Sequence, residues 1–415
     1  MSTSPSTHDR RYEWQIVLLL SLGFGLVGLD RWIIAPLFPA MAKDLGLGYE
    51  ALGLASGALG IAWGLCSTVF GPLADRRGRR VILLPALVVF SLMAGFTGAV
   101  NGLLFLLVLR TVMGAAEGAF LASSVAAVAD ASAPQRRGLN QGLQLSAFPL
   151  LGFGLGSVIA TQLLTVLPSW RWVFVIVAVP GLLLAAILWR VLREPAHLAG
   201  AAPTAGTATP AKAPVPWSTV LASRNVRLAM LSLVCAMSGI FVLGSMVPSY
   251  LVDHLGLPPA QMGLIMSALG VGGFIGDAAV GAASDRLGRK PVSIGCFVLA
   301  VASLVLFTRT GANPLQLYVT LTLVSLFCFG LLSIMTGPVA TEAVPPALVA
   351  SAIGLVSGAG EIIGGGLVPV AAGFVAGAHG IQNVFWVSFV GLGLGVLVSL
   401  FLVETAPRRT APRAG

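Results

Sequence analysis

Charged residues are scarce in this chain. Only 9% of its 415 residues are Asp, Glu, Lys or Arg, whereas 57% are hydrophobic. In a typical soluble domain about a quarter of the residues carry charge. The chain therefore has too few charged groups to cover a water-soluble body of its size. This scarcity excludes a soluble globular protein and predicts an integral membrane protein.

Acidic residues, cysteine and histidine are also sparse. The 24 basic residues outnumber the 15 acidic ones, but they form short clusters between apolar runs, which argues against a nucleic-acid partner. The four cysteines lie within apolar runs at spacings that fit no metal site, so we interpret them as small buried hydrophobes. The four histidines lie outside these runs, and no nucleophile has a nearby base. The sequence predicts no enzyme, no catalytic residues, no metal and no cofactor other than protons.

Long apolar runs dominate what remains. A helix needs about 20 apolar residues to cross a bilayer, and the chain contains twelve such runs. An all-α membrane protein with twelve transmembrane helices is predicted. The expected spans are 14–41, 51–73, 81–100, 102–128, 138–165, 170–193, 225–250, 260–283, 291–309, 315–340, 347–374 and 380–404.

The basic residues predict the orientation of these spans. The two terminal segments and the loops after even-numbered spans hold 19 of the 24 Lys and Arg residues. Basic residues concentrate in cytoplasmic loops, so both termini are expected in the cytoplasm. High Ala and Gly content with only three Lys suits a bacterial chain. We therefore expect a multi-pass protein of the bacterial inner membrane.

The chain contains an internal repeat. GPLADRRGRR at 71–80 returns as GAASDRLGRK at 281–290, an offset of 210 residues. The duplicated loop, with six spans in each half, resembles the major facilitator superfamily. The resemblance implies two pseudo-symmetric six-helix halves around a central ligand site that opens to each side in turn. We expect an N-terminal half at 1–193, a cytoplasmic linker at 194–224 and a C-terminal half at 225–415.

The repeated loop predicts a gating motif. Its arginines can pair with carboxylates or helix ends across the cytoplasmic interface, and its glycines can adopt the positive φ of a tight turn. The resemblance implies gating and structural roles, and the alternative is that these charges only set the topology. The residues concerned are Asp75, Arg76, Gly78, Arg79, Asp285, Arg286, Gly288 and Arg289.

Four charges in the first and fourth spans have no charged counterpart at the 210-residue offset. They are Asp30, Arg31, Arg110 and Glu117. A charge within a membrane helix is costly and usually functional. Arg31 offers a planar fork of donors for a carboxylate, and a carboxyl group buried in the membrane at Asp30 or Glu117 can bind and release a proton. The alternative is that the four charges only lock the first and fourth spans together.

Two segments carry a closer resemblance. GLDRWIIAPLFP in the first span and LRTVMGAAEGAF in the fourth resemble the anion:cation symporter family of organic anion/H+ symporters. The resemblance implies that Arg31 contacts the substrate carboxylate and that Asp30 and Glu117 serve proton coupling, with Arg110 as a supporting charge. Spinster-type lipid transporters share similar motifs.

Three further side chains are candidates. Trp63 stands where family members often have a tyrosine, so it forms an aromatic wall of the site or serves packing alone. Glu361 is a second proton site, a ligand for a cationic substrate group, a partner of Arg31 in the empty state, or a structural residue. Asp277, two turns before Asp285, is expected to serve a gate or the scaffold.

These observations predict a secondary active transporter. It carries a small organic carboxylate anion together with H+ by alternating access, as a monomer in the lipid bilayer. The alternatives are a Spinster-like amphiphile or lysolipid transporter and an H+-coupled exporter. A membrane enzyme or a non-transporting receptor fits the residues less well. The identity of the acid, the H+ stoichiometry and the direction of transport do not follow from the sequence.

Overall fold

The computed structural model describes residues 9–133, 136–193, 217–345 and 348–406, without the side chains at 71, 72, 75, 76, 217 and 350. These residues form helices joined by short loops, and no strand occurs among them. Twelve helices of the described part are long and apolar enough to cross a membrane. The predicted fold class is confirmed, with span ends that differ from the expected ones by a few residues.

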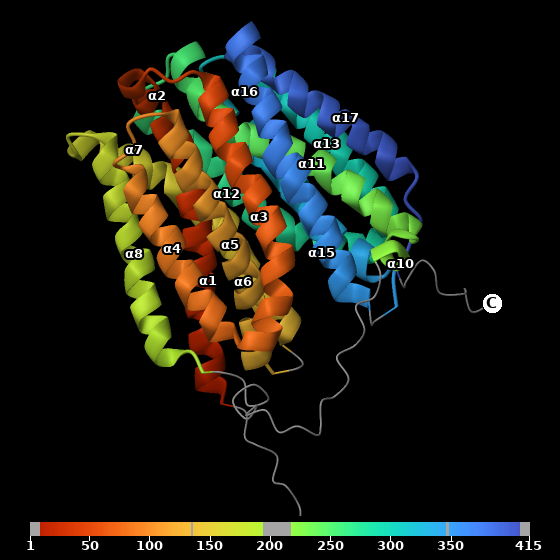
Figure 1. Ribbon diagram of the computed structural model, residues 1–415. Coiled ribbons are helices and arrows are strands. Elements are labelled where there is room, and N and C mark those ends of the chain that lie inside the picture. The colour runs from red at the N-terminus through yellow and green to blue at the C-terminus, as the bar shows by residue number, and fades with distance from the viewer. Residues whose placement is uncertain (1–8, 134–135, 194–216, 346–347, 407–415) are drawn as a thin grey trace, which may run out of the picture.

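The helices form two groups that follow one another along the chain (Figure 1). The first comprises α1 (Arg10–Trp32), α2 (Ile34–Leu45), α3 (Tyr49–Arg77), α4 (Arg79–Thr97), α5 (Leu103–Ala131), α6 (Arg137–Pro149), η1 (Leu150–Leu155), α7 (Gly156–Val166) and α8 (Trp170–Val191). The second comprises α11 (Arg224–Ser249), η2 (Tyr250–His254), α12 (Pro259–Leu287), α13 (Arg289–Arg309), α14 (Pro314–Ile334), η3 (Met335–Val339), α15 (Val349–Ala359), η5 (Gly360–Leu367), α16 (Val368–His379), η6 (Ile381–Val384) and α17 (Phe385–Leu400). A short helix, α10 (Trp217–Leu221), precedes the second group. Of the expected linker, 194–216 lies outside the described residues.

Prolines interrupt the regular helical pattern. The stretches η1, η2, η3 and η5 are π-helical, and each has a proline within it or at most two residues away. A proline removes a backbone donor and crowds the carbonyl four residues earlier, so the local hydrogen bonding must change. Single π-helical turns are frequent at functional sites. In this chain η5 carries Glu361.

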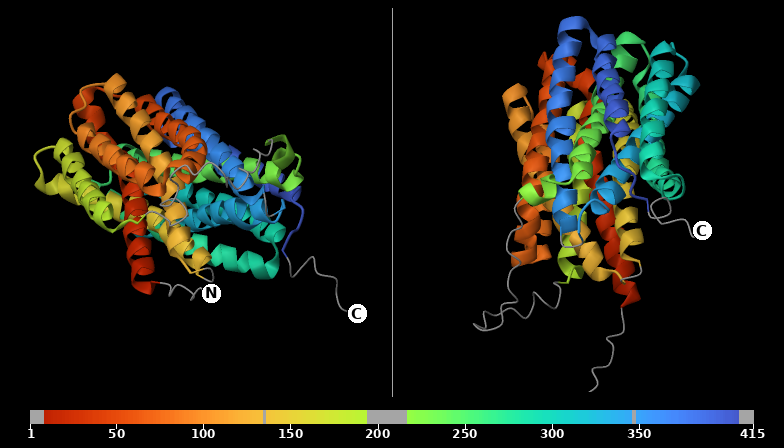
Figure 2. Two further views of the ribbon diagram at one scale, coloured as in Figure 1. Left: turned by 60° about the horizontal axis from the view of Figure 1, so that its bottom comes forward. Right: turned by 90° about the vertical axis from the view of Figure 1, so that its right-hand side faces the viewer.

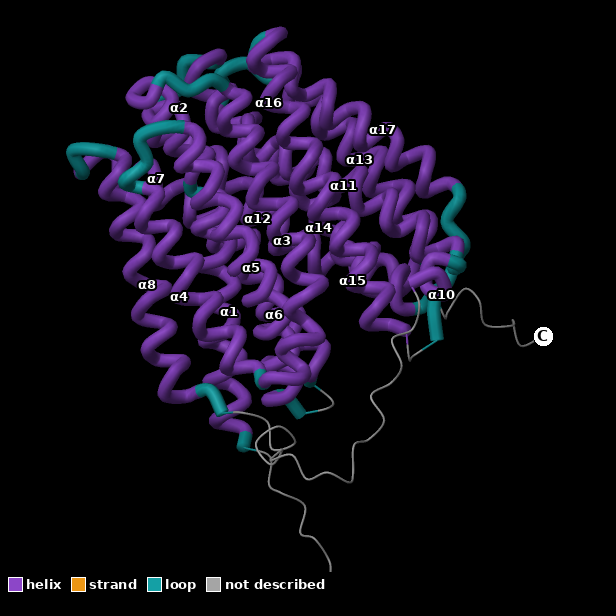
Figure 3. The backbone as a smooth tube through the Cα atoms, in the orientation of Figure 1, coloured by secondary structure: helices purple, strands orange, loops and turns teal. Residues whose placement is uncertain are grey.

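Twelve crossings return the chain to the side where it began. Arg193, after α8, lies beside Tyr12 near the start of α1, and Asn225 at the start of α11 is bonded to Val403 after α17. We call this side of the bundle the terminal end and the opposite side the far end. Figure 2 shows the bundle from two further directions, and Figure 3 shows the loops gathered at its two ends.

The two halves pack closely through glycines at two helix crossings. A Cβ on Gly60 of α3 would lie 2.5 Å from the carbonyl oxygen of Gly365 in η5. A Cβ on Gly270 of α12 would lie 2.3 Å from the backbone nitrogen of Gly154 in η1. Gly60 and Gly270 are 210 residues apart, so the repeat in the sequence is also a repeat in the packing. These crossings hold the halves together from the middle of the bundle towards the far end.

Candidate functional site

The first membrane crossing is interrupted beside Asp30 and Arg31. Helix α1 ends at Trp32 and α2 begins at Ile34. Pro36 has no N–H for the carbonyl of Trp32, four residues earlier, and its ring crowds that carbonyl. The interruption therefore falls one turn before Pro36 and places the two charged side chains at the end of α1, within the crossing that runs from Arg10 to Leu45.

Arg31 lies between the two halves. Its side chain is 5% exposed, and its Nη2 is 2.9 Å from Oε2 of Glu361 in η5. The guanidinium carbon lies 4.4 Å from the ring centre of Trp63 in α3 and 4.7 Å from that of Phe241 in α11. Phe241 stands 210 residues after Arg31, so positions equivalent in the repeat meet between the halves. Among the interpretations of Glu361, pairing with Arg31 is the arrangement that the structure contains.

Arg110 on α5 is bonded to the backbone where the first crossing is interrupted. Its Nη1 donates hydrogen bonds to the backbone carbonyls of Arg31, at 3.1 Å, and Asp30, at 3.4 Å. The side chain is 2% exposed. Arg110 therefore binds the backbone next to the candidate substrate residue and holds that segment in place.

Two carboxyl groups, those of Asp30 and Glu117, lie near the Arg110 side chain. Asp30 lies within electrostatic reach of Glu117 and Arg110. Glu117 is completely buried two turns beyond Arg110. Neither oxygen of Glu117, nor Oδ1 of Asp30, has a hydrogen-bond partner within the described part of the chain. A buried carboxyl group without a partner is more stable when it is neutral, so this cluster is suited to binding a proton.

The first copy of the loop motif lies at the terminal end, between α3 and α4. Gly78 has a φ of 102°, which a residue with a side chain rarely adopts. Arg79 pairs with Asp130 at the end of α5, with Nε 3.2 Å from Oδ2. The side chains of Asp75 and Arg76 lie outside the described residues.

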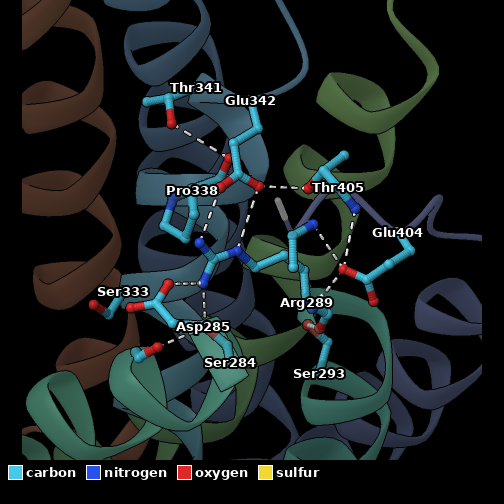
Figure 4. Close-up of polar contacts among 12 residues, drawn as sticks. Ser284, Asp285, Arg289, Ser293, Ser333, Pro338, Thr341, Glu342, Glu404 and Thr405 are labelled. Atoms are coloured by element: carbon cyan, nitrogen blue, oxygen red, sulfur yellow. Dashed lines mark hydrogen bonds and ion pairs between the residues drawn. The ribbon is translucent and has the colours of Figure 1, made fainter. Parts of the chain in front are cut away.

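The second copy, between α12 and α13, holds a denser polar cluster (Figure 4). Gly288 has a φ of 106°. Arg289 pairs with Asp285 at 2.6 Å and with Glu342, after η3, at 2.9 Å. Glu404, after α17, accepts hydrogen bonds from the backbone N–H groups of Arg289, at 2.8 Å, and Lys290, at 3.2 Å. The motif thus ties three segments of the second half together at the terminal end.

Arg286 and Asp277, two further candidates in the second half, take no part in this polar cluster. Arg286 is exposed. The backbone carbonyl of Asp277 accepts a hydrogen bond of 3.2 Å from Ser333 of α14. The Asp277 side chain has no ion pair among the described residues.

A sequence model described as Major Facilitator Superfamily matches residues 20–276 and 229–415. The two matches together take in nearly the whole chain. The chain belongs to the Major Facilitator Superfamily.

Individual relatives of this superfamily member are named as transporters. The hexuronate transporter of Bacillus subtilis (strain 168) is 28% identical over 294 residues, which cover 71% of this chain and 69% of the relative. The 4-hydroxybenzoate transporter PcaK of Pseudomonas aeruginosa is 26% identical over 347 residues, 76% of each chain. The family and these names confirm the prediction of a transporter and not an enzyme.

A solved structure shares the fold. A bacterial homologue of the human lysosomal transporter Spinster, in an inward-facing and unoccupied conformation, matches with a TM-score of 0.72. The match covers 95% of each chain at 18% sequence identity. At this identity the likeness shows the major facilitator fold alone.

The predicted residues of this major facilitator protein fall into three places. Arg31, Trp63 and Glu361 meet between the halves. Asp30, Arg110 and Glu117 form the adjoining buried cluster. The loop-motif residues lie apart from both, at the terminal end.

A polar cluster that is not among the predicted site residues lies at the terminal end of the first half. Glu13 of α1 is fully buried. It accepts hydrogen bonds from Arg136 and, at 2.8 Å, from Asn140. Glu13 stands one residue before the expected start of the first span, so its sequence position does not mark it as a membrane charge. The signal that indicates it is the repeat, because Ser223, 210 residues later, is uncharged.

Proposed function

We propose that this major facilitator transporter carries an organic carboxylate together with protons. The observation that carries the proposal is the ion pair between Arg31 and Glu361, which joins the two halves at 2.9 Å. A substrate carboxylate has the same chemistry as the Glu361 side chain and can replace it on the Arg31 guanidinium. The substrates named for the two curated relatives, a hexuronate and 4-hydroxybenzoate, are carboxylates and support this choice.

Proton coupling rests on Glu117 and Asp30. Both are buried, and Glu117 lies within electrostatic reach of Arg31, Arg110 and Glu361. When a substrate anion occupies Arg31, or when Glu361 is released from it, the charge near Glu117 changes. Binding of a proton at Glu117 or Asp30 then offsets the negative charge that the substrate brings. The loaded protein carries less net charge through the membrane interior, which favours reorientation.

The cycle requires an orientation, and we assign the terminal end to the cytoplasm of a bacterial inner membrane. The distribution of basic residues supports this assignment. In this orientation the glycine crossings lie towards the extracellular side. Arg79, Asp130 and the Arg289 cluster lie at the side that must close in the opposite state. We assign the working unit as a monomer because each of the two halves supplies a wall of the site.

The role of Arg31 is tested by Arg31→Ala in proteoliposomes. We expect uptake of the organic acid to fall by about tenfold to a hundredfold, because a charge-assisted bond contributes about 1.5 to 3 kcal/mol. Arg171→Ala is the matched control, since Arg171 also pairs with a carboxylate and contacts a Trp ring but lies at the far end. Uptake by Arg31→Ala at unchanged affinity would show that Arg31 is not the anchor.

The role of Glu117 is tested by separating exchange from accumulation. In Glu117→Gln the side chain is always neutral, so substrate binding and reorientation no longer depend on a proton. We expect counterflow of labelled substrate to survive while accumulation driven by a pH gradient disappears. Full accumulation in this variant would contradict the assignment.

Thermal stabilisation of the purified protein by a lysolipid, and by no organic acid, would favour the amphiphile carrier instead.

A further inference from the structure

The space around Arg31 is walled by aromatic rings. Trp63 and Phe241 contact its guanidinium, and the ring centre of Trp32 lies 5.5 Å from it. Trp32 and Phe241 also meet edge to face, with centroids 5.1 Å apart. These three side chains are each 5% exposed or less. Their packing fixes the orientation of the rings.

A second layer of rings supports the first. Trp63 contacts Phe148, with centroids 5.9 Å apart, and Phe24 at 6.5 Å. Trp32 lies over Phe153, with centroids 4.2 Å apart. Further aromatic rings therefore pack behind both Trp63 and Trp32. They are built in advance of binding, as ligand sites usually are.

Three serine hydroxyls in this region already donate hydrogen bonds within their own helices. Ser238 and Ser245, one turn before and one turn after Phe241 on α11, donate to carbonyls of their own helix. Ser67, one turn after Trp63, does the same. Nη1 of Arg31 and the indole N–H of Trp32 are buried donors without a hydrogen-bond partner in the described part of the chain. A ligand with many hydroxyl groups would leave most of them without partners.

The Glu361 carboxylate and the Phe241 ring both pack against Gly365. An added Cβ there would come within 2.7 Å of Oε2 and 2.8 Å of the Phe241 ring. The Glu361 side chain therefore fills the volume next to the aromatic rings. A ring attached to a carboxylate bound at Arg31 would take this volume when Glu361 is displaced.

We propose that the carboxylate carried is an aromatic acid of benzoate type with one or two polar ring substituents at most. This inference rests on the proposed function and narrows its substrate class. The carboxylate takes the place of Glu361 on Arg31, and the ring packs against Trp63 and Phe241. A single ring hydroxyl can accept a hydrogen bond from the unpaired indole N–H of Trp32. Polyhydroxylated sugar acids are poor ligands for these walls.

The test compares three acids on the purified protein by calorimetric titration. Benzoate is the aromatic probe, cyclohexanecarboxylate has similar size without a flat π face, and galacturonate is polyhydroxylated. We expect benzoate to bind at least about tenfold more tightly than galacturonate, and cyclohexanecarboxylate to lie between them. Tighter binding of galacturonate, together with its counterflow, would overturn the aromatic preference and leave the carboxylate transporter intact. Absence of binding and counterflow for all carboxylates would overturn both.

A matched pair of variants assigns the preference to the walls. Phe241→Leu keeps an apolar side chain but removes the ring, so the advantage of benzoate over cyclohexanecarboxylate should fall by about twofold to tenfold. Phe307→Leu makes the same change in a fully buried ring that contacts Tyr250 and Phe385, away from Arg31, and should leave the ratio unchanged. An unchanged ratio in Phe241→Leu, in a variant that still binds benzoate, would show that the ring does not select the substrate.

Discussion

At the scale of single residues, Arg31 and Arg110 are two buried arginines with different partners. Arg31 binds the carboxylate of Glu361, which sits on another helix and has a chemical equivalent in a substrate. Arg110 binds two peptide carbonyls, which no ligand replaces. An exchangeable partner suits a binding role, and a fixed partner suits a positioning role.

This difference leads to a prediction for Glu361. In Glu361→Gln the internal competitor for Arg31 loses its charge, so a substrate carboxylate meets a less occupied guanidinium. We expect the dissociation constant for the acid to decrease by about threefold to tenfold, measured by calorimetry on the purified protein. Glu342→Gln, which breaks the pair with Arg289 at the terminal end, is the control. A weaker complex in Glu361→Gln would mean that Glu361 helps to bind the substrate instead of competing with it.

At the scale of helices, Glu404 acts as a cap supplied by a distant segment. Its carboxylate accepts the backbone N–H groups of the first two residues of α13, which have no partner within their own helix. A negative charge at a helix N-terminus also interacts favourably with the helix dipole. The cap fastens the segment after α17 to the start of α13 (Figure 4).

The stabilisation by this cap should depend on pH. Burial acts to raise the pKa of the Glu404 carboxyl, but hydrogen bonds from the backbone of Ala406, Arg289, Lys290 and Thr405 outweigh it and hold the pKa below its usual value. A lowered pKa in the folded state means that the cap stabilises the protein above the unfolded-state pKa. This contribution is lost as the pH falls through the folded-state pKa.

Glu404→Gln tests this dependence by thermal unfolding of the detergent-purified protein. At neutral pH we expect the variant to be less stable by about 1 kcal/mol, the usual cost of losing a helix cap. The difference in melting temperature between the two proteins should shrink as the pH is lowered into the acidic range. A difference that stays constant with pH would show that the charge of Glu404 is not what stabilises the cap.

At the scale of the whole molecule, the sequence predicts the repeat and the twelve crossings because apolar length and duplicated motifs are local patterns. The meeting of Arg31 with Phe241 and Glu361 is not local, since it depends on how two halves pack across 210 and 330 residues of chain. Pairing with Arg31 is therefore one of several interpretations of Glu361 that the sequence allows, and the contact between Arg31 and Phe241 is not predicted. The cap at Glu404 escaped prediction for the same reason, because its partners begin 115 residues earlier.

The two glycine crossings predict that the halves move as rigid bodies. Gly60 and Gly270 lie at different crossings, so preventing close approach at one must also loosen the other if each half rocks as a unit. Gly60→Val places methyl groups where the backbone of Gly365 now lies, and such overpacking costs about 1 to 3 kcal/mol. The conformation in which the far end is closed should therefore become less populated.

The reporter for this motion is placed at the other crossing. Thr161 of α7 is fully buried beside Gly263 of α12, so Thr161→Cys, with the four native cysteines replaced, reports opening there. We expect a membrane-impermeant maleimide to label this cysteine about fivefold faster or more when Gly60→Val is added. Gly393→Val is the control, because an added side chain there meets nothing within 4 Å. Faster labelling with Gly60→Val but not with Gly393→Val would demonstrate coupling between the crossings. Equal labelling rates with and without Gly60→Val would mean that α3 adjusts locally and that the halves do not move as units.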